Sequence, residues 1–190
     1  PYSNTYAPAA LLRSLWEEAI GAAAEKGAGI AVSTRPDCLG DEILSLLVEF
    51  ASRTDVYLEI GMESIYDATL QRINRGCSME DFFQALRRFR DARASAPEGR
   101  LTLCLHMIAG FPWESEEEQL AYAEVVNQSP ADFLKIHHLQ VQQGTSLALE
   151  YQERPFHLRS LEEHARFLTR FLPLLDPGIA IQRLFAEAKG

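Results

Sequence analysis

Five short apolar runs, each closed by a tight cluster of polar residues, set the rhythm of this chain. They lie at 29–37, 56–64, 101–115, 133–145 and 179–187, and stretches of helical period separate them. Such alternation is typical of a parallel α/β sheet or barrel. In these folds the chemistry gathers where strands end and loops begin. The polar clusters are therefore where function is to be sought.

The segments between the runs carry helix start signals. Three pairs fit the capping box, namely Ser78 with Asp81, Ser115 with Glu118, and Ser160 with Glu163. We expect strands at 29–34, 56–60, 101–109, 133–139 and 179–184, and helices at about 8–26, 41–53, 66–74, from 78 onward, 115–128 and 160–172. Every connection between strands is long enough for a parallel crossover.

The number of runs constrains the architecture further. The chain opens with a polar, loop-like segment and a helix instead of a strand, and five strands are too few to close a barrel. We therefore expect one α/β domain over residues 1–190, forming an incomplete parallel (β/α) barrel. Its first one or two βα units are expected to be missing from this chain.

Composition narrows the class of protein. The 190 residues include 18 basic and 27 acidic ones, a formal net charge of −9, so no general attraction to nucleic acid is expected, although a local basic patch is compatible with it. No apolar run approaches the roughly 18 residues of a membrane span, and the first residues lack a secretion-signal pattern. The three cysteines are widely spaced, as is typical of reduced thiols in a cytoplasmic protein.

Each polar cluster, taken alone, has a structural interpretation beside a functional one. Glu59 lies within an apolar strand, where an unpaired carboxylate is costly; a buried ion pair with Arg35 and a ligand contact both remain open. Arg75 is either an ordinary residue at the end of a helix or a side chain whose guanidinium binds a carboxylate through two hydrogen bonds. His106 is either a core histidine or part of a ligand floor. No GxGxxG, Walker, HExxH or GxSxG motif is present.

Taken in order, the clusters resemble the radical S-adenosylmethionine (radical SAM) superfamily, over nearly the whole chain. The matching strings are YSNTYAP (2–8), TRPDCL (34–39), LEIGMES (58–64), INRG (73–76), HMIAGFP (106–112), KIHHLQVQQGT (135–145) and IQRL (181–184). YSNTYAP, TRPDCL and IQRL are fairly specific to the YhcC-like group. The other strings are shared with the oxygen-independent coproporphyrinogen dehydrogenases and the Elongator catalytic subunit.

The resemblance implies an incomplete (β/α)6 barrel with two cofactors. A CxxxCxxC loop after the first strand holds a 4Fe-4S cluster, and the cluster's fourth iron chelates S-adenosylmethionine (SAM). Electron transfer then cleaves SAM to a 5′-deoxyadenosyl radical, which abstracts hydrogen from substrate. An electron donor such as flavodoxin or ferredoxin is implied. The substrate is unknown, with tRNA as one candidate.

The resemblance also assigns residues to SAM. The cofactor-binding set is Ser33, Glu63, Arg75, His106, Ile108, His138 and Leu139. Arg75 matches the arginine that binds the SAM carboxylate in the family. Glu63 occupies the position of a glutamine that contacts the methionine or ribose region of SAM. Ser33 and His106 replace family acids, with His106 at the ribose contact. Ile108 matches the adenine-packing strand, and 138–139 match the backbone edge that reads adenine.

At the barrel mouth we expect substrate contacts from Arg35, Gln140, Gln143 and Arg183. An open barrel also exposes a sheet edge, and we expect a homodimer to cover it.

The cysteines depart from the family pattern. Cys38, Cys77 and Cys104 contain no CxxxCxxC, and lone cysteines do not hold a cluster. We expect the cluster only in the full-length protein, with its loop before residue 1, and an inactive chain without it.

Two alternatives stay open. A metal-dependent hydrolase on a TIM-like barrel would use Glu59, His106 and His138 as ligands at strand ends. A non-catalytic, degenerate relative that lost its cluster would only bind.

Overall fold

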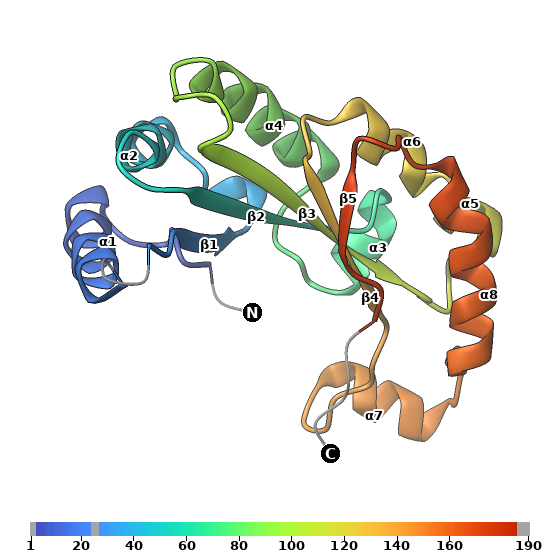
Figure 1. Cartoon of the computed structure of the whole chain (residues 1–190). Helices are drawn as coiled ribbons and strands as arrows, with labels where there is room; N and C mark the ends of the chain where they lie inside the picture. Colours follow the sequence, from blue (N-terminus) through green and yellow to red (C-terminus); the bar gives the residue numbers. More distant parts are fainter. Residues whose placement is uncertain (1–2, 24–26, 186–190) are drawn as a thin grey trace.

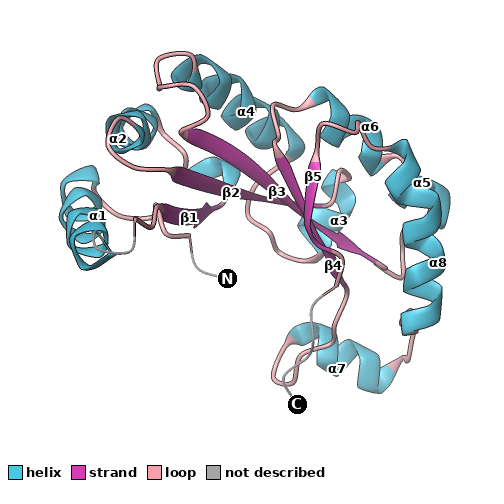
Figure 2. Ribbon diagram, viewed as in Figure 1, coloured by secondary structure: helices cyan, strands magenta, loops and turns pink. Residues whose placement is uncertain are grey.

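The computed structural model describes residues 3–23 and 27–185. Five strands form one parallel sheet in the order β1-β2-β3-β4-β5 (Figures 1 and 2). Their bounds are β1 Ile30–Thr34, β2 Val56–Glu63, β3 Leu101–Ala109, β4 Phe133–His138 and β5 Ala180–Arg183. The expected α/β class and the open parallel sheet of an incomplete barrel are thus confirmed.

Most of the helices follow one another along the outer side of the curved sheet, whereas α7 lies apart from it, beyond the end of β4 (Figure 1). Their bounds are α1 Ala9–Ala23, α2 Asp41–Ala51, α3 Asp67–Arg72, α4 Met79–Arg93, α5 Glu116–Leu120, α6 Tyr122–Gln128, α7 Ser146–Glu153 and α8 Leu161–Phe171. Three of them, α4, α5 and α8, begin at the expected capping boxes. Across the described residues, none is long and apolar enough to cross a membrane.

The two faces of the sheet differ because side chains alternate along a strand. Toward the helices point fully buried residues such as Leu58, Leu105 and Ile136, which pack with Phe50 of α2 and Phe89 of α4 in one core. The inner face instead carries polar side chains, namely Ser33 on β1, Glu59 on β2, His106 on β3, and Lys135 and His137 on β4. The fold therefore gathers polar groups on the concave side of an apolar sheet.

Three expectations about elements need correction. The second strand runs past 60 to Glu63, because a bulge lets it continue. The helix expected over 115–128 is divided at Ala121 into α5 and α6. Helix α7 was not expected, because it has no apolar stripe and no buried residue. The expected end of the first helix, at Lys26, lies outside the described residues.

Candidate functional site

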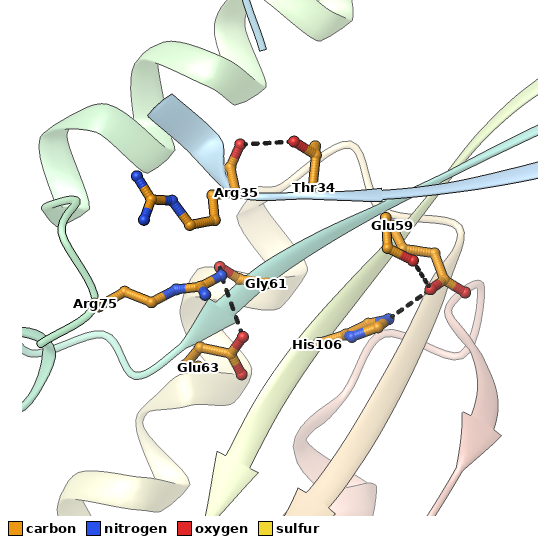
Figure 3. Close-up of a pocket in the computed structure, with 8 residues that line it drawn as sticks. Thr34, Arg35, Glu59, Gly61, Glu63, Arg75 and His106 are labelled. Carbon is orange, nitrogen blue, oxygen red and sulfur yellow. Dashed lines mark hydrogen bonds and ion pairs between the residues drawn. The ribbon is translucent and has the colours of Figure 1, made fainter. Parts of the chain in front are cut away.

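A pocket of about 140 Å³ opens at the carboxyl ends of β1, β2 and β3 (Figure 3). It is lined by Ser33, Thr34, Arg35, Glu59, Gly61, Glu63, Arg75 and His106. The structure thus brings together four residues expected at the cofactor and one expected at the substrate. They come from segments up to 73 residues apart in the sequence, so the fold itself assembles the pocket.

Glu59 is the centre of a polar network on the inner face. Its carboxylate accepts a hydrogen bond from Ser33 Oγ at 2.6 Å and forms an ion pair with Lys135 of β4. The Nε2 atom of His106 lies 3.3 Å from Glu59 Oε2. The side chains of Glu59 and Lys135 are only 11% and 17% exposed. Four adjacent strands are therefore tied together through one carboxylate.

The expected pairing of Glu59 with Arg35 is wrong. Arg35 instead donates from Nε to Asp37 Oδ1 at 2.9 Å, within its own turn. Pro36 begins a short 3-10 turn there, while Arg35 stays extended at ψ 153°, as a residue before proline does. The cation that neutralises Glu59 comes from β4 because Lys135 points to the same face of the sheet.

Burial and charge set the protonation of this network. Burial alone would raise the pKa of Glu59, but hydrogen bonds from Lys135 and Ser33 and the nearby His106 hold that pKa below its ordinary value. Burial lowers the pKa of His106 to about 4, against the attraction of Glu59 and with the help of Lys135. His106 is therefore neutral near pH 7. Its buried Nε2 lacks a hydrogen-bond partner among the described residues, since Glu59 is near but not aligned.

Glu63 lines the pocket beside a bulge in β2. The register with β3 shifts between Gly61 and Glu63, and Glu63 adopts φ 61°, an unusual value for a non-glycine residue. Gly61 is needed here, because a Cβ atom would overlap the Glu63 carboxylate and the Arg75 guanidinium.

Arg75 holds this bulge from the opposite side of the pocket (Figure 3). Its Nη2 donates to the carbonyl oxygen of Gly61 at 3.0 Å and lies 3.2 Å from Glu63 Oε1. Burial raises the pKa of Glu63, and the charge of Arg75 opposes that shift. The Arg75 side chain is 9% exposed, and its buried Nε lacks a hydrogen-bond partner among the described residues. One edge of the guanidinium is thus available to an anionic ligand.

The remaining expected cofactor residues divide between the two faces of β3 and β4. Ile108 follows His106 by two residues and so shares its inner face. Of the two neighbouring histidines, His137 faces inward, with its ring 5.6 Å from that of His106. The His138 ring instead lies 5.5 Å from that of His164 on α8.

The backbone that follows β4 extends its pairing with β3. The N–H of Leu139 donates to the carbonyl oxygen of Ala109 at 2.8 Å. The edge expected to read adenine therefore has this N–H already engaged within the sheet.

The expected substrate residues do not all meet. Gln140 interacts with His138 Nε2 at 3.0 Å. Gln143 is exposed in the loop after β4, and Arg183 is exposed on β5. Burial lowers the pKa of His137, and the charges of Arg183 and Lys135 add to this, so Arg183 acts electrostatically on the inner face. Only Arg35 of the expected set lines the pocket.

Glu114 is a buried carboxylate that the sequence analysis missed. Its Oε1 accepts from Ser64 Oγ at 2.7 Å and Thr69 Oγ1 at 2.5 Å, and its Oε2 accepts from Tyr122 Oη at 2.7 Å. These hydroxyls belong to the β2–α3 turn, α3 and α6. Glu114 therefore fastens the loop after β3 to the segment that leads to Arg75. The signal was an acid inside an apolar loop, between Trp113 and a helix cap.

The residues that the structure describes do not form a metal or cluster site. No group of three His, Cys, Asp or Glu in the described ranges is placed to hold a metal ion, and His106 and His138 face opposite sides of the sheet. Cys104 is buried, and burial raises its pKa to about 12, whereas a cluster needs thiolates. The chain's own cysteines therefore do not fit a 4Fe-4S cluster, and the metal-hydrolase alternative lacks a ligand set.

Comparison with known proteins identifies the pattern. Residues 7–126 match the model described as the radical SAM superfamily, and residues 131–190 match the model described as the Radical_SAM C-terminal domain. Protein YhcC of Escherichia coli K12 is 32% identical over 189 residues, which cover 99% of this chain and 58% of that protein. A tRNA uridine(34) acetyltransferase of Methanocaldococcus infernus is 30% identical over 122 residues, covering 62% of this chain and 21% of the relative.

Solved structures share the fold at lower identity. Coproporphyrinogen III oxidase (HemN) of Escherichia coli, described as a radical SAM enzyme, aligns with a TM-score of 0.59 at 15% identity, over 85% of this chain and 36% of the other. The chain spans somewhat more than half the length of the curated relatives it matches over nearly its whole extent.

Proposed function

This chain belongs to the radical SAM superfamily, and we propose that it is the SAM-binding portion of a radical SAM enzyme. The observation that carries the proposal is the buried Arg75 guanidinium, whose Nε lacks a partner and whose Nη2 lies where a Cβ atom on Gly61 would overlap it. A guanidinium with free N–H donors binds the carboxylate of an amino acid well, because the two groups match in charge and geometry. SAM carries that carboxylate together with an ammonium group and ribose hydroxyls.

The other pocket residues fit the remaining polar groups of SAM. Glu63, next to Arg75, would accept a hydrogen bond from the ammonium group or the ribose. His106 is neutral and its Nε2 lacks a partner, so it would hold a ribose hydroxyl without adding charge. Ile108 would pack on the adenine. Bound SAM would supply the carbon–sulfur bond whose reductive cleavage gives the radical for hydrogen abstraction.

The iron–sulfur cluster would need cysteine ligands, which the pocket residues do not include. Because Cys104 is buried and the three cysteines have no cluster spacing, we propose that the CxxxCxxC loop is supplied by sequence outside these 190 residues. We propose a cytoplasmic enzyme that receives electrons from a flavodoxin or ferredoxin. For the substrate, tRNA is the first class to test, because a tRNA-modifying protein is among the relatives. A homodimer would cover the open edge at β5.

The test uses the complete gene product, with any sequence that flanks this chain. The protein is reconstituted anaerobically with iron and sulfide, reduced with dithionite and given SAM, and 5′-deoxyadenosine is quantified by mass spectrometry. We expect 5′-deoxyadenosine to form. SAM binding without cleavage would leave the non-catalytic binding domain as the function, and absence of SAM binding would overturn the proposal.

A further inference from the structure

A second hollow, of about 490 Å³, lies on the helical side of the fold, where α5 and α8 pack together. Its lining consists of Glu116, His157, Arg159, Glu163, Arg166 and Arg170. Four of these six side chains are basic or can become so. Such a concentration is notable in a chain of net charge −9. Since residues 163, 166 and 170 follow helical spacing, they share one face of α8.

The two acids of this hollow already have partners. Arg170 forms an ion pair with Glu116 at the start of α5. Glu163 Oε2 lies 3.0 Å from His157 Nε2 and accepts from the Ser160 backbone N–H at 2.7 Å, as part of the capping box of α8. Neither carboxylate is therefore left to neutralise the remaining arginines.

Arg159 and Arg166 form no ion pair among the described residues. The guanidinium of Arg159 lies 4.4 Å from the centre of the Phe167 ring, and its Nη1 is buried without a hydrogen-bond partner in the described part of the chain. Burial lowers the pKa of Arg159. A buried donor without a partner is costly, and that cost disappears when an anion binds there.

We propose that this hollow binds a phosphate group of a ligand. The two guanidinium groups, neither of which forms an ion pair among the described residues, match the double charge of a phosphate, whereas a carboxylate carries only a single charge. Arg166 is exposed and Arg159 is half-buried, so one arginine anchors the anion and the other remains reachable from solvent.

The position of the hollow relates it to the carboxyl edge of the sheet. The side chain of Arg159 passes over Gly110, where a Cβ would lie 3.6 Å from Arg159 Cδ. Gly110 directly follows β3, the strand that carries His106. A phosphate held here would sit at the same edge as the SAM pocket, on the outer side. The inference does not depend on SAM binding, since it uses none of the residues of that pocket.

The test is titration calorimetry of the full chain with pyrophosphate at low salt. We expect binding in the millimolar range or tighter, and a loss of about tenfold or more in affinity for Arg159→Gln and for Arg166→Gln, because each removes a charged fork. Arg87→Gln is the matched control, since Arg87 is exposed on α4 and paired with Glu80; we expect it to stay within about twofold of the unmodified chain.

A second arm uses a single-stranded RNA of twelve nucleotides. Tighter binding of RNA than of pyrophosphate, with the same dependence on both arginines and a steep salt dependence, would assign the phosphate to a nucleic-acid backbone. Equal binding would assign it to a small phosphorylated ligand. If the Arg159→Gln protein fails to fold, the affinity of the Arg166→Gln protein decides the test, because Arg166 is exposed and its replacement should not disturb folding. No binding of either probe, or binding unchanged in the Arg166→Gln chain, would overturn the proposal.

Discussion

The Nη2 atom of Arg75 lies 3.2 Å from Oε1 of Glu63, while the Nε of the same guanidinium has no hydrogen-bond partner in the described structure. Arg75→Lys keeps the charge but removes the planar fork. We expect the affinity for SAM to fall by about tenfold or more, because a bidentate contact to a carboxylate becomes a single one. Equilibrium dialysis of the reconstituted complete protein with labelled SAM measures this.

Arg87→Lys serves as the control for that substitution. Arg87 pairs with Glu80 on the surface, with 59% of its side chain exposed, so SAM binding should not change. Equal SAM affinity in the Arg75→Lys and Arg87→Lys proteins would contradict the assignment of the carboxylate to Arg75.

Gly61 provides a second test of the pocket. Gly61→Ala places a methyl group against the Glu63 carboxylate and the Arg75 guanidinium. Both side chains must then shift, and we expect SAM binding to be lost with only a modest change in stability, because the displaced groups are the ends of flexible side chains. Gly21→Ala on α1 is the comparison, since open space surrounds Gly21. It should stabilise the fold by roughly 0.5–1 kcal/mol and leave binding intact.

The alternation of apolar runs and capping boxes predicted most of this fold, because strand period and helix start are local properties of the sequence. The pocket depended on non-local geometry. The sequence placed Glu59 in a strand but did not identify Lys135 as its partner, since that contact crosses β3 and depends on register. Likewise, the alternation of side chains along a strand predicted that only one of His137 and His138 faces inward. That this residue is His137 depends on the pairing of β4 with β3.

The periodicity of apolar residues in the sequence also did not predict the bulge after Gly61. Alternation from Glu59 through Gly61 already places Glu63 on the inner face, but the shift in register with β3 and the φ of 61° at Glu63 depend on how the strands pair. Glu114 escaped for a related reason. Its three hydroxyl partners come from separate segments, so its place between Trp113 and a helix cap did not by itself reveal that they surround it.

Lys135→Met tests the network across the strands. It leaves the Glu59 carboxylate, 11% exposed, without a cation, and removing one partner of a buried pair typically costs about 3–5 kcal/mol. We expect a loss of that order in urea unfolding at pH 7. The double variant Lys135→Met, Glu59→Gln removes both charges and should recover much of the loss. If the double variant is as unstable as Lys135→Met alone, the ion pair is not the cause.

Glu114→Gln replaces an acceptor of three hydroxyl hydrogen bonds with a group that has one acceptor oxygen. At least one hydroxyl then faces an amide donor, and we expect a loss of about 2–3 kcal/mol of stability, measured by urea unfolding. Tyr122→Phe removes one of the three bonds, the one to Oε2, and should cost less, about 1–2 kcal/mol. A larger effect for the tyrosine than for the glutamate would show that packing of the ring, not the carboxylate, holds this loop.

Acid should unfold the protein partly through His106. Burial lowers its pKa from the ordinary 6.5 to about 4 in the fold, so between these pH values the unfolded chain binds a proton that the folded chain excludes. Stability from this group is complete above pH 6.5 and is lost as the pH falls toward 4, by at most about 3 kcal/mol. The lowered pKa of Glu59 affects stability only at lower pH, because the ordinary pKa of that carboxyl is already 4.5.

Urea unfolding of the unmodified chain and of His106→Asn, at pH 7.5, 6 and 5, isolates this contribution. His137 and His138, whose pKa values burial also lowers, are present in both proteins, so their contributions cancel in the difference. The variant should be less stable at pH 7.5 relative to the unmodified chain than it is at pH 5, because asparagine does not titrate. Parallel pH profiles for the two proteins would mean that His106 is protonated as readily in the fold as in the unfolded chain, and would contradict the lowering of its pKa by burial.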